Sequence, residues 1–271
     1  MTTFIKFGGS VITDKLRSQT PDLNTIHALA RAIATVQQQA PHKRIVVSHG
    51  SGSYGHVAAA QYGIHRGLGA DADWYGFAVT AGAALRLNRI VVDALLDVHV
   101  PAFSLQPSTT VQTQAGAVVS WDTSHIERAL EHHLTPVIHG DVAFDRTQGC
   151  SIASTELLLQ WLCTVPALAP SRIILVGESA VYTADPHANP DAVRIPVIHR
   201  NNIDTVIGGA SGSYGIDVTG GMASKIRLMW SLISQNHALD VVFIRPDSSL
   251  LCDAILDAPL TEGSRMMWEP V

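Results

Sequence analysis

The segment Thr3-Phe4-Ile5-Lys6-Phe7-Gly8-Gly9-Ser10 decides the fold of this chain. Residues 3–7 form a short, mostly apolar run, which predicts a buried strand, and the glycine pair predicts a tight turn at its end. Glycines at such a turn let backbone N–H groups approach an anion closely, and Lys6 adds positive charge from the strand. Because Gly-Gly turns after strands are common, this segment is informative only together with similar segments elsewhere.

Short strand-like runs alternate with longer helical segments along the rest of the chain. The apolar pattern predicts strands at residues 44–48, 102–105, 136–139, 172–176 and 240–244. It predicts helices at residues 20–39, 73–95, 124–132, 155–162 and 221–234. Alternation of this kind is typical of βαβ units, so we expect an α/β fold with a mainly parallel sheet.

Two helix starts are indicated by capping residues. Thr20-Pro21-Asp22 predicts a helix with Pro21 at its first helical position. Asp73 is expected to cap a long helix whose inner face would contain Phe77, Ala81, Ala84, Leu87, Val91 and Leu95. That face predicts either plain core packing or the apolar wall of a substrate site.

Composition and charge exclude several classes of protein. The chain has 271 residues, of which 46% are hydrophobic and 15% charged, and its net charge is -5. These values favour a well-buried globular protein over a disordered one. The sequence contains no basic cluster of the kind that would indicate a nucleic-acid partner. The apolar runs are shorter than the ~18 residues that span a bilayer, and residues 1–6 do not resemble a secretion signal. Because the three cysteines form no CxxC pair, we expect a cytoplasmic protein.

Lysine is scarce in this sequence and is concentrated beside glycine. The 18 basic residues include only four lysines, which are Lys6, Lys15, Lys43 and Lys225. Lys6 and Lys15 flank the first glycine turn, and Lys225 follows a glycine pair at 220–221. Lysine is a compact point charge, whereas arginine is a planar fork. This use of lysine therefore predicts sites for a small, highly charged group such as phosphate.

A second glycine segment, residues 50–55, reads Gly-Ser-Gly-Ser-Tyr-Gly and follows a predicted strand. It fits the G-x-G-x-x-G pattern, but the second apolar strand with its acidic residue, which a Rossmann unit needs next, does not follow. Ser51 also stands where a G-x-S-x-G nucleophile elbow has its first glycine. We therefore expect an anion-binding loop flanked by His49 and His56, not a dinucleotide site or a serine hydrolase.

A third segment, residues 217–225, places two glycines directly before a predicted helix. Free N–H groups and the positive end of the helix dipole would face an anion there, with Lys225 about one turn into the helix. The spacing differs from the G-x-x-x-x-G-K-[ST] phosphate loop. The 13 histidines show no H-E-x-x-H or similar spacing, so we expect no metal held by the protein.

Taken together, these segments resemble the amino acid kinase superfamily and, within it, the isopentenyl phosphate kinases. The resemblance rests on five stretches in family order, at residues 6–15, 49–56, 106–108, 139–141 and 217–225. It implies an open αβα sandwich with a mainly parallel central sheet. It also implies that residues 1–166 bind the phosphoryl acceptor, that residues 167–271 bind ATP with Mg²⁺, and that the protein forms a homodimer.

The same resemblance assigns roles to individual residues. Catalytic roles would belong to Lys6, Lys15, His56, Asp141 and Lys225. ATP would be bound by Lys6, Gly8, Gly9, Ser10, Gly52, Tyr182, Asp185, Gly220, Gly221 and Lys225. Isopentenyl phosphate, the acceptor, would be bound by Ser51, Gly52, Gly55, His56 and Thr155. In this scheme Lys15 stabilises the transferred group, His56 anchors the acceptor phosphate, and Asp141 orients the lysines.

Three departures from the family pattern lie within the expected site. Val176–Tyr182 lacks both aspartates that the family carries where the nucleotide base and ribose are expected. Ser51 replaces a glycine, and Ser154-Thr155-Glu156 replaces Ser-Gly-Asp, both where the acceptor phosphate is expected. The identity of the acceptor therefore stays open at this point.

Phosphoryl transfer between two phosphates needs positive charge and in-line positioning rather than a base, and the lysines and glycine turns would supply both. The leading hypothesis is an ATP-dependent kinase that converts isopentenyl phosphate to isopentenyl diphosphate. A second hypothesis keeps the chemistry with another small phosphate or phosphonate acceptor, as in the fosfomycin kinases. Carbamate, glutamate, aspartate or UMP as acceptor is disfavoured by His56. A nucleotide- or oxyanion-binding protein without turnover is the remaining alternative.

Overall fold

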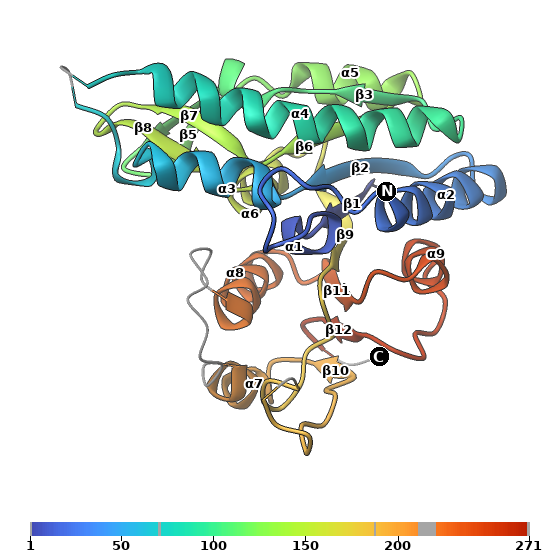
Figure 1. Cartoon of the computed structure of the whole chain (residues 1–271). Helices are drawn as coiled ribbons and strands as arrows, with labels where there is room; N and C mark the ends of the chain where they lie inside the picture. The colour runs from blue at the N-terminus through green and yellow to red at the C-terminus, as the bar shows by residue number, and fades with distance from the viewer. Residues whose placement is uncertain (1, 70–71, 187, 211–220, 270–271) are drawn as a thin grey trace.

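The computed structural model describes residues 2–69, 72–186, 188–210 and 221–269, and its centre is an eight-stranded sheet (Figure 1). β1 (Thr2–Phe7) lies between β9 (Pro170–Val176) and β2 (Arg44–His49) and pairs with both in parallel. The outer strands are β6 (Thr135–His139) and β3 (Ala102–Ser104) on one side, and β11 (Asp240–Ile244), β12 (Ser264–Met266) and β10 (Val197–Ile198) on the other. The β11–β12 pair is antiparallel and the other pairs are parallel, so the predicted mainly parallel sheet is confirmed.

Alternate residues of the central strands face two separate helical layers. Ile5 belongs to the core formed with α2 (Leu23–Gln39), α4 (Tyr75–Asp97) and α9 (Ser248–Leu256). Its neighbour Phe4 belongs to the core formed with α5 (Ser124–Glu131), α6 (Thr155–Cys163), α7 (Ile203–Ala210) and α8 (Gly221–Gln235). Side chains alternate in this way because a strand has a period of two residues. The open αβα sandwich is therefore confirmed.

A second, four-stranded sheet was not predicted. Its order is β5 (Ala117–Trp121), β4 (Val111–Gln114), β7 (Asp141–Asp145) and β8 (Gly149–Ala153). The carboxylate of Asp145 accepts hydrogen bonds from backbone N–H groups, including that of Gly116 in the β4–β5 turn at 2.8 Å. Burial raises the pKa of Asp145, but donors at Gly116, Thr147 and Gln148 outweigh it and lower the pKa to about 2. This ionised carboxylate therefore fixes two turns of the second sheet.

The structure moves the start of α2 relative to the prediction. Asp22 is the N-cap, and its carboxylate accepts a hydrogen bond from the Thr25 N–H at 3.0 Å. The prediction that Pro21 occupies the first helical position is therefore wrong. Pro21 instead forms an isolated antiparallel bridge with Thr13, which leaves the capping to the side chain that follows it.

The long helix α4 is confirmed, but the prediction that Asp73 is its N-cap is wrong. Trp74 is at the N-cap position, while the Asp73 carboxylate accepts a hydrogen bond from the Tyr75 N–H at 2.8 Å. The predicted inner face is buried at Ala81, Ala84, Leu87, Val91 and Leu95. No described helix has both the length and the apolarity needed to cross a membrane.

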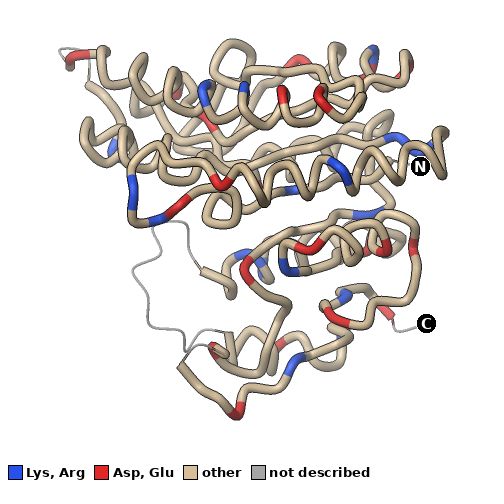
Figure 2. The backbone as a smooth tube through the Cα atoms, turned by 45° about the vertical axis from the view of Figure 1, so that its right-hand side comes forward, with Lys and Arg blue, Asp and Glu red and all other residues tan. Residues whose placement is uncertain are grey.

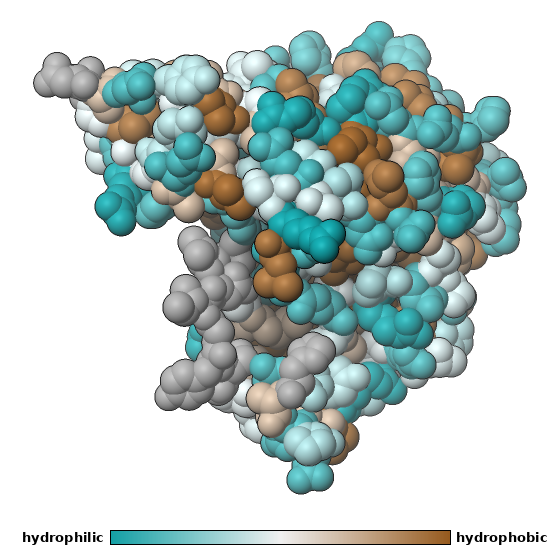
Figure 3. Space-filling view, in the orientation of Figure 1, coloured by the Kyte–Doolittle hydropathy of each residue, from teal (hydrophilic) through white to brown (hydrophobic). Residues whose placement is uncertain are grey.

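In the described part of the chain, residues of both charges, Lys and Arg with Asp and Glu, are mixed along the backbone (Figure 2). On the face shown in Figure 3, apolar side chains form small patches among polar ones.

Candidate active site

Four neighbouring strands of the main sheet are each followed directly by a glycine. These glycine N–H groups extend the ladders by donating to the last residue of the adjacent strand: Gly8 to Val176 at 2.8 Å, Gly50 to Phe7 at 3.0 Å, Gly140 to His49 at 3.0 Å, and Gly177 to Ile244 at 2.9 Å. Because these strands are parallel, the turns that follow lie along one edge of the sheet. Open α/β sheets bind their ligands at this edge.

The first two glycine turns touch each other with no side chain between them. A Cβ atom on Gly9 would lie 2.6 Å from the Gly52 nitrogen, and one on Gly52 would lie 2.7 Å from the Gly9 oxygen. The Thr13 hydroxyl joins the turns, since it donates to the Gly9 oxygen at 2.7 Å and accepts from the Ser53 N–H at 3.0 Å. The structure therefore brings the predicted segments 8–10 and 51–55 together.

Three helices begin beside these turns. α1 (Gly9–Ile12) follows the first turn, α3 (Gly52–Gln61) follows the second, and α8 begins at Gly221. The first N–H groups of a helix lack partners within the helix, and its dipole favours negative charge at that end. For the two longer helices, α3 and α8, this geometry suits the binding of phosphate groups.

Lys6 lies on β1 and forms an ion pair with Glu156 of α6. The two side chains are only 9% and 16% exposed. Burial raises the pKa of Glu156, but Lys6 and, more weakly, Lys225 outweigh it, so the pKa lies below its usual value. Glu156 is therefore an ionised carboxylate that electrostatically links two of the lysines predicted to act on phosphate.

Sequence reasoning did not include Glu156 among the functional residues. It assigned the orientation of the lysines to Asp141, whose spacing after β6 fits the family pattern. The signal that could have identified Glu156 is the segment Ser154-Thr155-Glu156, in which the glutamate takes the place of the family's aspartate. A carboxylate one methylene longer was read only as a departure, although it retains the charge.

Asp141 is buried at the start of β7. Its carboxylate accepts hydrogen bonds from the Val142 N–H at 2.8 Å and the Ser108 N–H at 3.1 Å, and it lies 3.5 Å from His139 Nε2. These contacts fix Asp141 to the backbone of the second sheet and of the turn that contains Ser108. Its role in orienting the lysines stays a prediction.

Lys15 follows the α1 turn and forms an ion pair with Glu178. The side chains are 60% and 46% exposed, so this pair contributes little to stability. Glu178 lies in the turn after β9, the segment in which the family's two aspartates are missing. The structure therefore places Lys15 in contact with the predicted nucleotide side through Glu178, at the same edge of the sheet as Lys6.

The predicted acceptor residues lie on and beside α3. Ser51 is its N-cap, and a Cβ atom on Gly55 would lie 2.5 Å from the Ser51 hydroxyl oxygen. His56 follows on the exposed side of the helix. Thr155 is buried, and its hydroxyl donates to the His49 carbonyl at 2.8 Å, so it supports the strand end behind the loop.

The predicted nucleotide residues lie in the segments after β9, which form the other half of the main sheet. Gly221 has a φ of 62° and begins α8, which carries Lys225 one turn later. Tyr182 forms an isolated bridge with Arg194 in the loop before β10, and the Asp185 carbonyl accepts hydrogen bonds from the next turn. Gly220, together with residues 217–219, lies outside the described residues.

The predicted apolar wall is mostly core packing. Ala81 and Ala84 are buried between α4 and its neighbours, so neither offers a free surface. Phe77 differs because it is half-buried, and its ring centroid lies 4.7 Å from that of Phe144 and 5.6 Å from that of Trp74. This aromatic group lies where α4 meets the second sheet.

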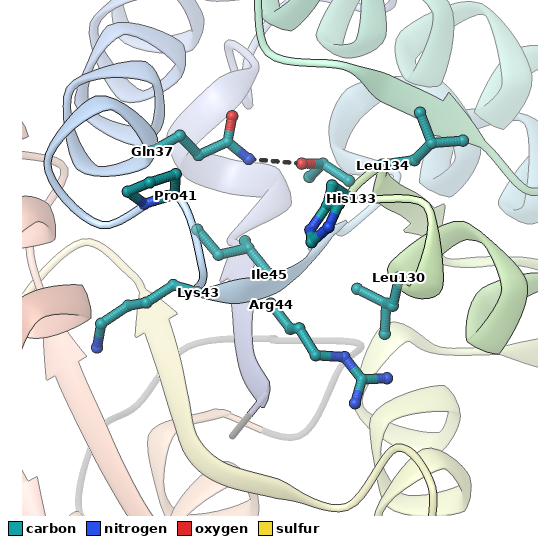
Figure 4. A pocket seen from close by; sticks show the side chains of 9 residues that line it. Gln37, Pro41, Lys43, Arg44, Ile45, Leu130, His133 and Leu134 are labelled. Carbon is teal, nitrogen blue, oxygen red and sulfur yellow. Dashed lines mark hydrogen bonds between the residues drawn. The ribbon is translucent and has the colours of Figure 1, made fainter.

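A cavity of about 160 Å³ lies at the opposite edge of the sheet (Figure 4). It is lined by Arg44, at the first position of β2, and by His133 and Leu134, which precede β6. The glycine turns follow the last positions of these strands, so this cavity is not part of the candidate active site. Among the described residues, no group of three or more His, Cys, Asp or Glu side chains is arranged to hold a metal ion.

Comparison with known proteins agrees with this arrangement. A family model described as "Amino acid kinase family" matches residues 1–244. The isopentenyl phosphate kinase of Methanothermobacter thermautotrophicus is 34% identical over 245 residues, which cover 88% of this chain and 89% of that protein. That of Methanocaldococcus jannaschii is 33% identical over 254 residues, or 90% of each chain.

A solved structure titled "X-ray structures of isopentenyl phosphate kinase" superposes with a TM-score of 0.80 at 30% identity. The superposition covers 98% of this chain and 100% of that chain. The likeness therefore extends over the main sheet and both helical layers.

Proposed function

This chain belongs to the amino acid kinase family, and from that premise we propose that it is an ATP-dependent kinase that phosphorylates isopentenyl phosphate to isopentenyl diphosphate. The observation that carries the proposal is the edge of the main sheet, where two touching glycine turns lie beside the buried pair of Lys6 and Glu156. The relatives that share about a third of their residues with this chain over nearly its whole length bear that activity in their names.

In the proposed reaction, an oxygen of the acceptor phosphate attacks the γ-phosphorus of ATP. The bond from that phosphorus to the bridging oxygen breaks, and ADP leaves with the electron pair. The acceptor is a phosphate monoester with a second pKa of about 6, so it is largely ionised at neutral pH and needs no general base. What the protein must supply is positive charge between the two anions and in-line positioning.

The residues of the sheet edge suit these tasks. Residues 1–166 would hold the acceptor, with the N–H groups at the start of α3 and the His56 side chain facing its phosphate. Residues 167–271 would hold ATP, with the start of α8 and Lys225 at its phosphates. Lys6 lies on the central strand between the two halves, where it would offset the repulsion between donor and acceptor.

We propose that Mg²⁺ is bound by the phosphate oxygens of ATP and by water. Magnesium keeps several waters and commonly uses few protein ligands in kinase sites. When bound, the ion neutralises charge on the ATP phosphates. The homodimer implied by the family stays a prediction.

The test is to incubate the protein with ATP, Mg²⁺ and one of four acceptors, and to measure ADP release. The acceptors are isopentenyl phosphate, dimethylallyl phosphate, geranyl phosphate and fosfomycin. Turnover of the prenyl phosphates supports the proposal, whereas turnover of fosfomycin alone would replace it with the phosphonate alternative. Binding of ATP without ADP release on any acceptor would favour a protein that binds nucleotide without turnover.

Replacing His56 by alanine is expected to raise the KM for isopentenyl phosphate at least about tenfold, because a hydrogen bond to a charged group contributes roughly 1.5–3 kcal/mol. The dissociation constant of ATP should stay within about twofold, since His56 lies on α3 and not on the predicted nucleotide side. His65→Ala, an exposed histidine on the nearby helical turn Ile64–Arg66, is the matched control. Equal weakening of acceptor and ATP binding would contradict the assigned role.

A further inference from the structure

A buried chain of hydrogen bonds lies directly behind the acceptor loop. His49 is the last residue of β2 and is 0% exposed. Its Nδ1 lies 2.9 Å from the Gly50 carbonyl oxygen, and its Nε2 lies 3.1 Å from Nδ2 of Asn88 on α4. The chain ends at Ser104 of β3, whose hydroxyl donates to Asn88 Oδ1 at 2.5 Å. Three elements of the fold, β2, α4 and β3, therefore meet behind one peptide group of the loop.

The Gly50 carbonyl determines the tautomer of His49. A carbonyl oxygen only accepts hydrogen bonds, so the imidazole must carry its proton on Nδ1. Nε2 is then an acceptor, which matches the Asn88 amide as donor, and the remaining Asn88 oxygen receives the Ser104 hydroxyl. Burial, with a smaller contribution from the His139 ring, lowers the pKa of His49 to about 3, so the ring is neutral at physiological pH.

This chain of hydrogen bonds determines the direction of the next N–H group. A trans peptide is planar, so the Ser51 N–H points opposite to the Gly50 carbonyl of the same peptide group. Because that carbonyl is directed inward at His49, the Ser51 N–H is directed away from the core, at the point where α3 begins. The preceding peptide is also held, since the His49 carbonyl accepts from Thr155 Oγ1 at 2.8 Å and from the Gly140 N–H at 3.0 Å.

We propose that His49 and Asn88 are positioning residues that keep the Gly50–Ser51 peptide turned so that its N–H donates to the acceptor phosphate. The inference rests on the proposed function, which places that phosphate at the start of α3. Gly50 gives this peptide a freedom of rotation that a residue with a side chain would restrict. Without the donor on His49, the peptide can turn over, and a carbonyl oxygen would then face the phosphate and repel it.

A purely structural role for His49 makes a different prediction. Its ring stacks on His139 with centroids 5.6 Å apart, so any smaller side chain would leave a packing defect beside β6. Such a defect would lower stability and disturb acceptor and ATP sites alike, whichever groups the new side chain carried. The positioning role instead requires a donor at the place of Nδ1 and affects the acceptor in particular.

The experiment compares His49→Asn with His49→Leu. The two side chains have similar size, but the asparagine amide can place a donor near the position of Nδ1, and leucine cannot. The quantities to be compared are the melting temperature, kcat, the KM for ATP and the KM for isopentenyl phosphate. We expect His49→Leu to raise the acceptor KM at least tenfold with the ATP KM within twofold, and His49→Asn to restore most of the acceptor affinity at a comparable melting temperature.

Asn88→Leu and Ser104→Ala extend the test in case His49→Leu does not fold. Both variants leave the His49 ring in place but weaken the hydrogen bonds that favour its Nδ1-protonated form. Each should therefore raise the acceptor KM, by less than His49→Leu does. Equal acceptor KM values for His49→Leu and His49→Asn, or a parallel rise of the ATP KM, would overturn the inference. If the wild-type protein itself neither binds nor turns over isopentenyl phosphate, the proposed function fails. That outcome can be told apart from failure of the inference alone, in which the wild-type protein is active and the variants keep its acceptor KM.

Discussion

Replacing Lys6 by methionine is expected to lower kcat by about a hundredfold to a thousandfold while leaving the KM for ATP within a few-fold. Methionine keeps the length of the side chain and removes its charge, and the loss of one preorganised donor to a developing negative charge typically costs about that much. The matched control is Lys43→Met, because Lys43 lies at the opposite edge of the sheet and donates to the Ile255 carbonyl. Steady-state ADP release with isopentenyl phosphate gives kcat and the KM for ATP of both variants.

The same substitution should also affect stability, and Glu156 makes that effect separable from catalysis. Lys6→Met leaves the Glu156 carboxylate buried without its main partner, which costs about 3 kcal/mol, the low end of the range for broken buried pairs. Lys225 still compensates part of its charge. The double variant Lys6→Met with Glu156→Gln removes the unpaired charge, so urea unfolding should show most of the stability restored while kcat stays low. Recovery of both properties together would contradict a catalytic role for Lys6.

The pH dependence of stability provides a second check on Glu156. Its folded-state pKa lies below the ordinary value of 4.5, so its contribution to stability is fully present above that value. The contribution is lost as the pH falls through the folded-state pKa, because the carboxylate must then bind a proton. Glu156→Gln should therefore flatten the acid side of the stability profile relative to the wild-type protein.

The main sheet could be predicted because its central strands can be recognised from the local sequence alone. β1, β2, β9 and β11 are apolar runs buried on both faces, and each of β1 and β2 leads into a glycine turn. The second sheet could not be predicted in the same way. Its strands are short, and the tie that holds its turns is the Asp145 carboxylate, whose donors come from separate turns of the chain. Such a contact leaves no periodic signal in the sequence.

The candidate site shows the same division. The glycine turns and Lys6 could be predicted because glycines directly follow short apolar runs and the few lysines of the chain lie beside glycine. The partner of Lys6 was not found, because Glu156 is 150 positions away along the chain and only the packing of α6 against the sheet brings it near. The hydrogen bonds of His49 were missed for a related reason, since Asn88 and Ser104 come from a helix and a strand that carry no motif.

Replacing Gly52 by alanine is expected to lower kcat/KM for isopentenyl phosphate at least about a hundredfold, because a misplacement of about 1 Å at a positioning element has an effect of that size. Gly52 has a φ of 49°, and a new Cβ atom would lie against Thr13 and 2.7 Å from the Gly9 oxygen. Neither neighbour can yield alone, since the Thr13 hydroxyl bonds to both glycine turns. The methyl group must therefore push the two turns apart.

Gly63→Ala separates this displacement from backbone strain. Gly63 has a similar φ of 65°, but nothing lies within 4 Å of the place where its Cβ would be. Both variants carry the left-handed strain, about 1–2 kcal/mol for a residue with a side chain, yet only Gly52→Ala moves the turns. Thermal unfolding should thus show the strain cost in both and a further loss of stability in Gly52→Ala, while kcat/KM falls in Gly52→Ala alone. If Gly63→Ala lost as much activity, strain in the first part of the chain would explain the effect, and the contact between the two turns would not be what positions the phosphates.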